Sequence, residues 1–277
     1  MLNDRKIALI GVGTMGKTLA RGLLSSGAAA AENLCGSVAH AERAAERSGE
    51  VGIDVGHDNA AAARISDAIV LCVKPRGAVA VIEELAAAGA LDHDPLLVSI
   101  AAGTRTEELE AAASRQLRVV RAMPNTPCQI GQGMTVISGG RYATTDDLAV
   151  AEALMSPLGR VLRLDEEHMD AVTGLSASGP AFIYVIIEAL AEGGVMVGLP
   201  RKVATELAAQ TVQGAARMVI ETGRHPAALK DDVTTPAGCT ISALLALEDG
   251  KLRSVLARGV QEAARSASRL GGDGGRT

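Results

Sequence analysis

The chain has 277 residues, 48% of them apolar, which is enough for a sizeable core in one large domain or in two of ordinary size. Its 27 lysine and arginine residues against 32 aspartate and glutamate residues give a formal net charge of -5, and aromatic residues make up 1% of the chain. This composition argues against nucleic acid as a partner, because it lacks a cationic excess to neutralise phosphates and rings to stack on bases.

Cysteine usage and the N-terminus predict a cytoplasmic protein without a metal site. The cysteines form no CxxC pair and no metal-ligand spacing; they are Cys35, Cys72, Cys128 and Cys239. The N-terminus reaches glycine too early to contain the apolar core of a signal peptide. The longest apolar stretch, residues 181–199, is about as long as a membrane span but contains Glu188 and Glu192. We therefore expect a buried helix there and no membrane partner.

In the first part of the chain, short apolar or β-branched runs alternate with stretches rich in Ala, Leu, Glu and Arg. This alternation is typical of βα units with a mainly parallel sheet. The predicted strands are 7–11, 33–38, 51–55, 68–73, 96–101, 118–123, 134–138 and 161–164. The predicted helices are 15–26, 41–48, 59–64, 76–88, 104–113 and 146–156.

Strand signals stop after Leu164, and the rest of the chain is predicted to form helices separated by glycine and proline. These helices are 166–173, 180–197, 200–222, 226–232, 240–248 and 251–270. The change in composition predicts a domain boundary near residue 165. The glycine-rich end, 271–277, is predicted to be a flexible tail.

A glycine motif follows the first predicted strand and opens the first predicted helix, which is the context that the G-x-G-x-x-G dinucleotide fingerprint requires. Its residues are Gly11, Val12, Gly13, Thr14, Met15 and Gly16. The first glycine permits a tight turn, the second lets the backbone approach a pyrophosphate, and the third allows close packing of the helix. The alternative, an ordinary turn between strand and helix, explains this context less well.

The end of the second predicted strand bears on the choice of cofactor. An Asp or Glu at this point would bind the 2′-hydroxyl of NAD. Residues 35–40 contain no carboxylate, and Ser37 offers a hydroxyl with His40 and Arg43 close behind. We therefore expect NADP(H) to be preferred, with NAD(H) as the alternative. His40 and Arg43 are equally compatible with solvated residues at the start of a helix.

Three further segments end predicted strands at the same edge of the sheet, where open α/β folds bind their ligands. They are Val73-Lys74-Pro75, Ala101-Ala102-Gly103 and the run 123–127, MPNTP. Small residues and prolines suit walls against a flat nicotinamide ring. Each segment is also compatible with an ordinary turn, and Lys74 with a solvated lysine.

Two hydroxyl-rich segments, 176–180 and 234–240, precede predicted helices in the second part of the chain. Such helix ends offer free N–H groups and a positive dipole to a carboxylate. N-capping explains one hydroxyl well, but several together with glycine less well. Motifs of serine hydrolases, zinc proteases and P-loop enzymes are absent from the sequence, so hydrolysis and metal chemistry lose support.

Taken together, these residues resemble the pyrroline-5-carboxylate reductase family, which carries out the last step of proline biosynthesis. The resemblance is carried by 11–16, 72–75, 99–103, 121–127, 171–184 and 225–244. The most specific block is the one before the helix at 240, where the family pattern is D-x-V-T-S-P-G-G-T-T-I. This chain departs from it at Thr235, Ala237 and Cys239, which puts the loop conformation at Ala237 in question, and it retains Gly238 and Thr240.

The resemblance implies an α/β architecture with an N-terminal Rossmann domain, residues 1–165, followed by an all-helical dimerisation and substrate-binding domain, residues 166–270. It implies a homodimer, and in larger assemblies a decamer of five dimers. The implied cofactor-binding residues are Gly11, Val12, Gly13, Thr14, Met15, Gly16, Ser37, Asn59, Val73, Lys74, Pro75, Ala101, Ala102 and Gly103. The implied substrate-binding residues are Thr235, Gly238, Cys239 and Thr240.

The implied reaction is the reduction of 1-pyrroline-5-carboxylate to L-proline by NADPH, with Thr240 hydrogen-bonded to the ring nitrogen as the predicted catalytic residue. A β-hydroxyacid dehydrogenase is the rival enzyme, but no lysine lies between Lys74 and Lys202 to serve on its catalytic helix. A cofactor-binding regulator without turnover is the rival of another class. The helix at 180–197 is apolar nearly all round, which independently predicts an obligate dimer.

Overall fold

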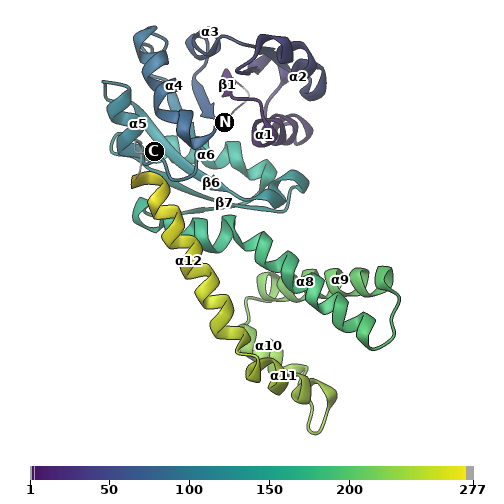
Figure 1. Ribbon diagram of the computed structural model, residues 1–277. Coiled ribbons are helices and arrows are strands. Elements are labelled where there is room, and N and C mark those ends of the chain that lie inside the picture. Colours follow the sequence, from purple (N-terminus) through teal and green to yellow (C-terminus); the bar gives the residue numbers. More distant parts are fainter. Residues whose placement is uncertain (1, 3, 273–277) are drawn as a thin grey trace. The chain divides into compact units, whose positions relative to one another are not determined.

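The computed structural model of the protein describes residue 2 and residues 4–272, which form two compact units (Figure 1). The first unit takes in the chain up to Ala177 and returns at Glu262, and the second unit covers Ser178–Gln261. The predicted domain boundary near residue 165 is a division by composition and stays a prediction.

The first unit contains a sheet with the strand order β3-β2-β1-β4-β5-β6-β7-β8. The strands are β1 (Ile7–Ile10), β2 (Leu34–Ser37), β3 (Asp54–Gly56), β4 (Ala68–Leu71), β5 (Leu96–Ser99), β6 (Arg118–Pro124), β7 (Gly133–Gly139) and β8 (Gly159–Arg163). All neighbouring pairs are parallel except β6 and β7, which are antiparallel. The predicted mainly parallel α/β architecture is confirmed.

Helices cover both faces of this sheet (Figure 1). They are α1 (Thr14–Ser25), α2 (Ala44–Val51), α3 (Asn59–Arg64), α4 (Pro75–Ala87), α5 (Thr106–Ala112) and α6 (Thr145–Met155), with short helical turns at η1 (Ala31–Asn33), η2 (Ala41–Arg43), η3 (Thr126–Ile130) and η4 (Ser156–Leu158). Along β1, Ile7 and Leu9 enter one core and Ala8 and Ile10 the other. Burial on both faces explains why these strands read as continuous apolar runs in the sequence.

The predicted strand 51–55 is wrong at its start. Helix α2 continues to Val51, Gly52 ends it with a left-handed φ of 74°, and β3 covers only Asp54–Gly56. The helix before it also extends beyond the predicted 41–48, as η2 followed by α2. Glycine just after a helix is the common way to end one, so Gly52 was a stop signal placed inside a run that resembles a strand.

The helical region begins with η5 (Glu166–His168) and α7 (Met169–Val172), followed by a π-helical turn, η6 (Thr173–Ala177), that the sequence did not predict. The remaining helices are α8 (Gly179–Met196), α9 (Arg201–Thr222), α10 (Pro226–Asp232), α11 (Cys239–Asp249) and α12 (Leu252–Gly272). Residues 271–272 of the predicted tail therefore belong to α12, and 273–277 lie outside the described residues.

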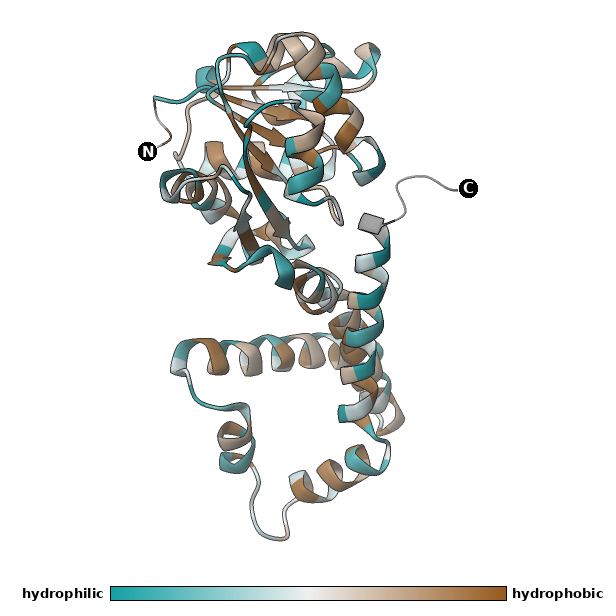
Figure 2. Ribbon diagram, turned by 90° about the vertical axis from the view of Figure 1, so that its left-hand side faces the viewer, coloured by the Kyte–Doolittle hydropathy of each residue, from teal (hydrophilic) through white to brown (hydrophobic). Residues whose placement is uncertain are grey.

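The apolar helix α8 is not buried within the chain, so the expectation of a buried helix is wrong for this chain alone, whereas the predicted dimer requires such an exposed face. Ala191 is its buried residue, whereas Tyr184 is 61% and Met196 87% exposed. Figure 2 shows apolar residues along the helices of the second unit. Helices α8 and α9 pack through small residues, including Ala191 and Ala204. By length and composition, Glu166–Met196 would also suffice to cross a membrane, but a helix covered by another protein surface has the same composition.

Candidate active site

The glycine motif forms a tight turn between β1 and α1. The N–H groups of Gly11 and Val12 both donate to the Ser37 carbonyl oxygen, at 3.1 and 2.8 Å. Gly11 has a φ of 96°, and a Cβ on it would lie 3.0 Å from the Val73 side chain and 3.1 Å from the Cys72 carbonyl carbon. Both the backbone angle and the space therefore require glycine at this position.

The other two glycines of the motif have different surroundings. A Cβ on Gly16 would lie 2.7 Å from the Gly11 carbonyl oxygen, so this glycine lets α1 approach the turn closely. A Cβ on Gly13 would have no atom within 4 Å, and no side chain caps the helix that Gly13 begins. The N-terminus of α1 is therefore open on the side where a diphosphate would bind, and the residues fit a dinucleotide.

Gly36, on the neighbouring strand β2, packs against this turn and was not singled out from the sequence. A Cβ on Gly36 would lie 2.5 Å from a methyl carbon of Val12, which is 1% exposed. Glycine on β2 thus makes room for the valine between the first two glycines of the motif. A lone glycine inside a predicted strand was the signal for such a close approach.

At the end of β2, the structure refines the prediction for Ser37. Its side chain is fully buried, and its hydroxyl donates to Oδ1 of Asn59 at 2.7 Å. Asn59 is the half-buried first residue of α3, whose N-terminus Asp58 caps by accepting the Ala61 N–H at 2.9 Å. With its Oδ1 engaged, Asn59 has its amide N–H groups free to reach a ribose or phosphate oxygen, and Ser37 orients it.

The loop after β2 also contains a carboxylate, Glu42, just beyond the strand end. Glu42 lies in η2, with its side chain 77% exposed and 4.0 Å from Nδ1 of His40. The strand end itself, residues 35–40, lacks a carboxylate as expected. The preference for NADP(H) or NAD(H) therefore depends on Glu42 as well as on Ser37 and Asn59.

The register of the parallel strands aligns the other predicted cofactor residues. Leu71 pairs with Ile10 on one side and with Ser99 on the other, so the carboxyl ends of β1, β4 and β5 lie at one edge. Strand order reverses between β1 and β4, because β2 and β3 lie on one side and β5 and β6 on the other. Ligands of open α/β sheets bind at such a switch point.

The segments that follow β4 and β5 lie at this edge. Lys74 is exposed at the N-cap position of α4, and Pro75 is in the first turn of that helix. Ala101 is buried, its N–H donates to the Ser99 hydroxyl at 3.3 Å, and Gly103 has a φ of 78°. The 101–103 segment is thus a tight, small-residue turn of the kind that can face a flat ring.

Cys72 lies directly under the glycine motif and is a neutral packing residue. Burial raises the pKa of its thiol to about 12. A raised pKa keeps this thiol protonated at neutral pH and so lowers its reactivity as a nucleophile. Among the groups that the structure describes, no cluster of three or more His, Cys, Asp or Glu could hold a metal ion.

Asn125 links two motifs that are far apart in the sequence. Its Nδ2 donates to the Ser176 carbonyl oxygen at 3.2 Å, and its Oδ1 accepts the Met134 N–H at 2.9 Å. Ser176 lies in the π-helical turn η6, where widened geometry leaves backbone groups in need of partners. The MPNTP run and the 176–180 segment are therefore parts of one hydrogen-bonded structure.

The 234–240 loop lies in the second unit, between α10 and α11. Ala237 adopts a φ of 57°, which answers the question that its replacement of glycine raised: the loop keeps a left-handed residue there. Gly238 donates its N–H to the Thr235 carbonyl oxygen at 3.0 Å. A Cβ on Gly238 would lie 2.4 Å from the Thr235 hydroxyl and 3.1 Å from the Thr235 carbonyl oxygen, so a larger residue would displace Thr235.

Thr240 is not the N-cap of α11, so simple N-capping does not explain its hydroxyl. The N-cap is Gly238, no side chain caps the helix, and Cys239 and Thr240 are its first two residues. Thr240 is half-buried and Cys239 exposed. Uncapped N–H groups and a hydroxyl at one helix end can receive a carboxylate and a polar ring atom.

Comparison with known proteins identifies both parts of the chain. Residues 6–103 match the family model for NADP oxidoreductase, coenzyme F420-dependent, and residues 166–270 match that for pyrroline-5-carboxylate reductase dimerisation. The pyrroline-5-carboxylate reductase of Arabidopsis thaliana is 41% identical over 96% of this chain and 95% of its own length. That of Methanosarcina acetivorans is 40% identical over 98% of this chain and 99% of its own length.

Solved structures agree with these sequence matches. A pyrroline-5-carboxylate reductase from Coxiella burnetii superposes with a TM-score of 0.90 at 33% identity, covering 97% of this chain and 99% of that one. The enzyme of Plasmodium falciparum, solved with NADP bound, superposes with a TM-score of 0.87 at 28% identity, covering 98% and 100%. The chain belongs to the pyrroline-5-carboxylate reductase family.

Proposed function

We propose that the protein reduces 1-pyrroline-5-carboxylate to L-proline with NAD(P)H, the last step of proline biosynthesis. The observation that carries this proposal is membership of the family over nearly the whole chain, because that match includes both the glycine turn and the 234–240 loop. The open N-terminus of α1 at Gly13 supports a dinucleotide cofactor independently.

Bound NADPH would supply hydride from the nicotinamide ring. Gly11, Val12 and Gly13 form the turn and use their own N–H groups within it and toward Ser37. The N–H groups of Thr14, Met15 and Gly16, in the first turn of α1, would hold the diphosphate, because no side chain caps this helix. Asn59, oriented by Ser37, binds the adenosine ribose and its 2′-phosphate. The segments that follow β4 and β5 line the nicotinamide end; they are Val73, Lys74, Pro75, Ala101, Ala102 and Gly103.

The 234–240 loop binds the substrate. The N–H groups at the start of α11, together with Thr235, Gly238 and Cys239, receive the carboxylate. The hydroxyl oxygen of Thr240 accepts a hydrogen bond from the protonated ring nitrogen, which orients the C=N bond and favours the iminium form that accepts hydride at carbon. The nitrogen keeps its proton and becomes the amine of proline, so the protein's main contribution is positioning.

The working form is a homodimer, with residues 1–165 binding the cofactor and residues 166–270 dimerising and binding the substrate. The match to a dimerisation model and the exposed apolar side chains of α8 and α9 support this assignment. A decamer of five dimers is the larger assembly. We expect sedimentation to give at least twice the mass of one chain; a stable, active monomer would contradict the dimer.

The reaction takes place in the cytoplasm, without a membrane or nucleic-acid partner. The decisive experiment follows NADPH oxidation at increasing concentrations of the cyclic imine carboxylate, with proline measured as the product. A β-hydroxyacid dehydrogenase would instead oxidise a hydroxy acid with NADP⁺. A cofactor-binding regulator would bind NADPH and turn over neither substrate.

A further inference from the structure

Arg121 is a buried cation in the middle of the sheet. It lies on β6 with 3% exposure, opposite Ser99 of β5 and Ser138 of β7, which are also buried. Its Nε and Nη2 atoms have no hydrogen-bond partner among the described residues. A buried guanidinium with unused donors is costly unless charges around it compensate, so its presence in the core requires a specific reason.

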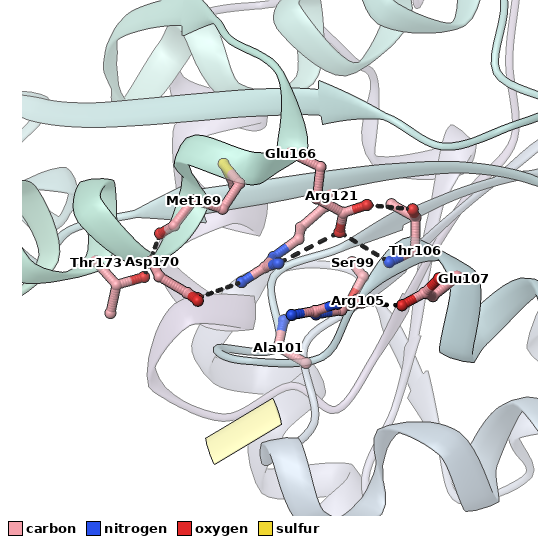
Figure 3. A network of polar contacts seen from close by, with 10 residues as sticks. All are labelled: Ser99, Ala101, Arg105, Thr106, Glu107, Arg121, Glu166, Met169, Asp170 and Thr173. Atoms are coloured by element: carbon pink, nitrogen blue, oxygen red, sulfur yellow. Dashed lines mark hydrogen bonds and ion pairs between the residues drawn. The ribbon is translucent and has the colours of Figure 1, made fainter. Parts of the chain in front are cut away.

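Two carboxylates face this guanidinium (Figure 3). Nη1 lies 3.3 Å from Oε1 of Glu166, and Nη2 lies 3.9 Å from Oδ1 of Asp170. Figure 3 shows the guanidinium between Asp170 on one side and Glu166 with Thr106 on the other. Glu166 and Asp170 both belong to the start of the helical region, in η5 and α7, so Arg121 attaches that segment to the sheet.

Glu166 uses its carboxylate to cap α5 from sixty residues away. Its Oε1 accepts the backbone N–H of Thr106 at 2.9 Å, and its Oε2 accepts the Thr106 hydroxyl at 2.5 Å. The local N-cap residue, Arg105, makes no side-chain capping bond. The N-terminus of α5 therefore depends on Glu166 for the partner that most helices obtain locally, and Arg121 holds that partner.

The turn between β5 and α5 is fixed at both ends by these contacts. At one end, Ser99 pairs with Arg121 in the strand register and accepts the Ala101 N–H. At the other end, Thr106 is held by Glu166. Between them lies the 101–103 segment that the proposed function assigns to the nicotinamide end of the cofactor, with Gly103 in a left-handed conformation.

We propose that Arg121 is a positioning residue for the cofactor: by holding Glu166 against Thr106, it fixes the 101–103 turn in the shape that the nicotinamide end of NADP(H) requires. The guanidinium is buried, so it acts through Glu166 and Thr106. The inference rests on the proposed function for the assignment of the 101–103 segment, and it adds a residue twenty positions further along the chain to the cofactor site.

The test compares two ligands that share the adenosine part and differ at the nicotinamide. NADPH contains the ring, whereas 2′-phospho-ADP-ribose lacks it. In Arg121→Met we expect the Kd of NADPH to rise about tenfold, the effect of losing one charge-assisted hydrogen bond. The Kd of 2′-phospho-ADP-ribose should change less than about twofold, within the scatter of distant substitutions. A role in stability alone would weaken both ligands equally or neither.

Arg118→Met is the matched control. Arg118 lies on the same strand, and its Nη1 bonds Oδ1 of Asp147 at 2.7 Å, the residue that completes the capping box of α6. It therefore also supports a helix N-terminus through a carboxylate, but at a helix that does not follow the 101–103 turn. We expect Arg118→Met to lower the melting temperature and to leave the ratio of the two Kd values at its wild-type level.

A double-mutant cycle tests the route through Glu166. If Arg121 acts through Glu166, Arg121→Met combined with Glu166→Gln should raise the NADPH Kd no more than the worse single variant, whereas independent effects would multiply. Arg121→Lys should restore part of the affinity. Should Arg121→Met fail to fold, Thr106→Val removes the hydroxyl that Glu166 binds, and the same selective loss of NADPH affinity is expected.

Equal weakening of both ligands in folded Arg121→Met or Thr106→Val, or no change in either, would overturn the proposal. Binding also separates this inference from the proposed function. A wild-type protein that binds NADPH but does not reduce the imine defeats the proposed function, while the selective effect in the variants still supports the role of Arg121. If the wild type reduces the imine but the variants show no selective loss of NADPH affinity, the proposed function stands and the role of Arg121 is refuted.

Discussion

The two loops that begin helices α1 and α11 are built alike and supported differently. Each has a glycine N-cap, no side-chain cap, and a left-handed residue shortly before the helix. In the first loop that residue is Gly11, packed against Cys72 and Val73 of the sheet. In the second it is Ala237, in an exposed stretch supported by local bonds such as that from Gly238 to Thr235. The first loop is therefore held by packing against the sheet, whereas the second carries backbone strain at Ala237.

Replacing two glycines of the first loop, Gly11 and Gly13, tests whether packing against the sheet supports this loop, and these substitutions have the largest expected effects. Gly11→Ala should cost about 2 to 5 kcal/mol in the free energy of unfolding, from left-handed strain plus overlap with Val73 and Cys72. Gly13→Ala should cost about 1 kcal/mol or less, because its Cβ meets open space. Gly13→Ala should nevertheless weaken NADPH binding more than about tenfold, by placing a methyl group where the diphosphate approaches. Urea unfolding and NADPH fluorescence measure the two effects.

Equal destabilisation by the two substitutions would show that the first loop is not held by the contacts described for Gly11. Wild-type NADPH affinity in Gly13→Ala would show that the diphosphate does not approach the N-terminus of α1.

In the second loop, Thr240→Val keeps the branched shape and removes the hydroxyl. We expect kcat to fall roughly 10- to 150-fold, the equivalent of about 1.5 to 3 kcal/mol for one polar contact in the transition state. Because Gly238 and not Thr240 is the N-cap, the melting temperature and the Kd of NADPH should stay near their wild-type values. Wild-type kcat in this variant would refute the catalytic role of Thr240.

The ratio of kcat/KM for NADPH to that for NADH tests whether Asn59, beside the first loop, is held in place to bind the adenosine end of the cofactor. With Asn59 oriented by the buried hydroxyl of Ser37 and no carboxylate at the end of β2, kcat/KM for NADPH should exceed that for NADH. Ser37→Ala should reduce this preference by about tenfold at most, because it removes one hydrogen bond that orients Asn59. An equal or higher kcat/KM for NADH in the wild type would contradict this account. It would indicate that Glu42, and not Asn59, decides the cofactor preference.

The smallest expected effect is that of Ala237→Gly, which tests whether the second loop carries backbone strain. Ala237→Gly relieves a left-handed alanine, so the free energy of unfolding should rise by about 1 kcal/mol, or roughly 2 to 4 °C in melting temperature. The same change at a residue with an ordinary φ would destabilise the protein instead. A lower melting temperature in Ala237→Gly would show that the loop does not hold the conformation described here.

Much of the fold was predictable because its signals are local. The glycine motif, the alternation of strands with helices and the end of strand signals near residue 164 each occupy a short stretch of sequence. The structure confirms the α/β architecture, and the comparisons confirm the family. Where two local signals competed, as at Gly52 inside an apolar run, the prediction favoured a strand and was wrong.

The parts that the sequence could not provide depend on distant partners. Glu166 accepts the N–H of Thr106, sixty residues away in the sequence, and the Ser37 hydroxyl donates to Asn59, twenty-two residues away. No spacing rule connects such pairs, because the sheet brings them together. The apolar pattern of α8 led to two expectations, a buried helix and a dimer, and its exposure within the chain agrees with the second and not with the first.

The return of helix α12 to the first unit affects the order in which the protein can be completed during synthesis. Residues from Glu262 onward group with the first 177 residues, and Ala267 of α12 is 3% exposed. A ribosome must therefore translate the whole second unit before the first unit receives its last segment. A chain that stops at Gln261 would lack the α12 residues that group with the first unit, such as Ala267, so this unit depends on residues that are translated after the whole second unit.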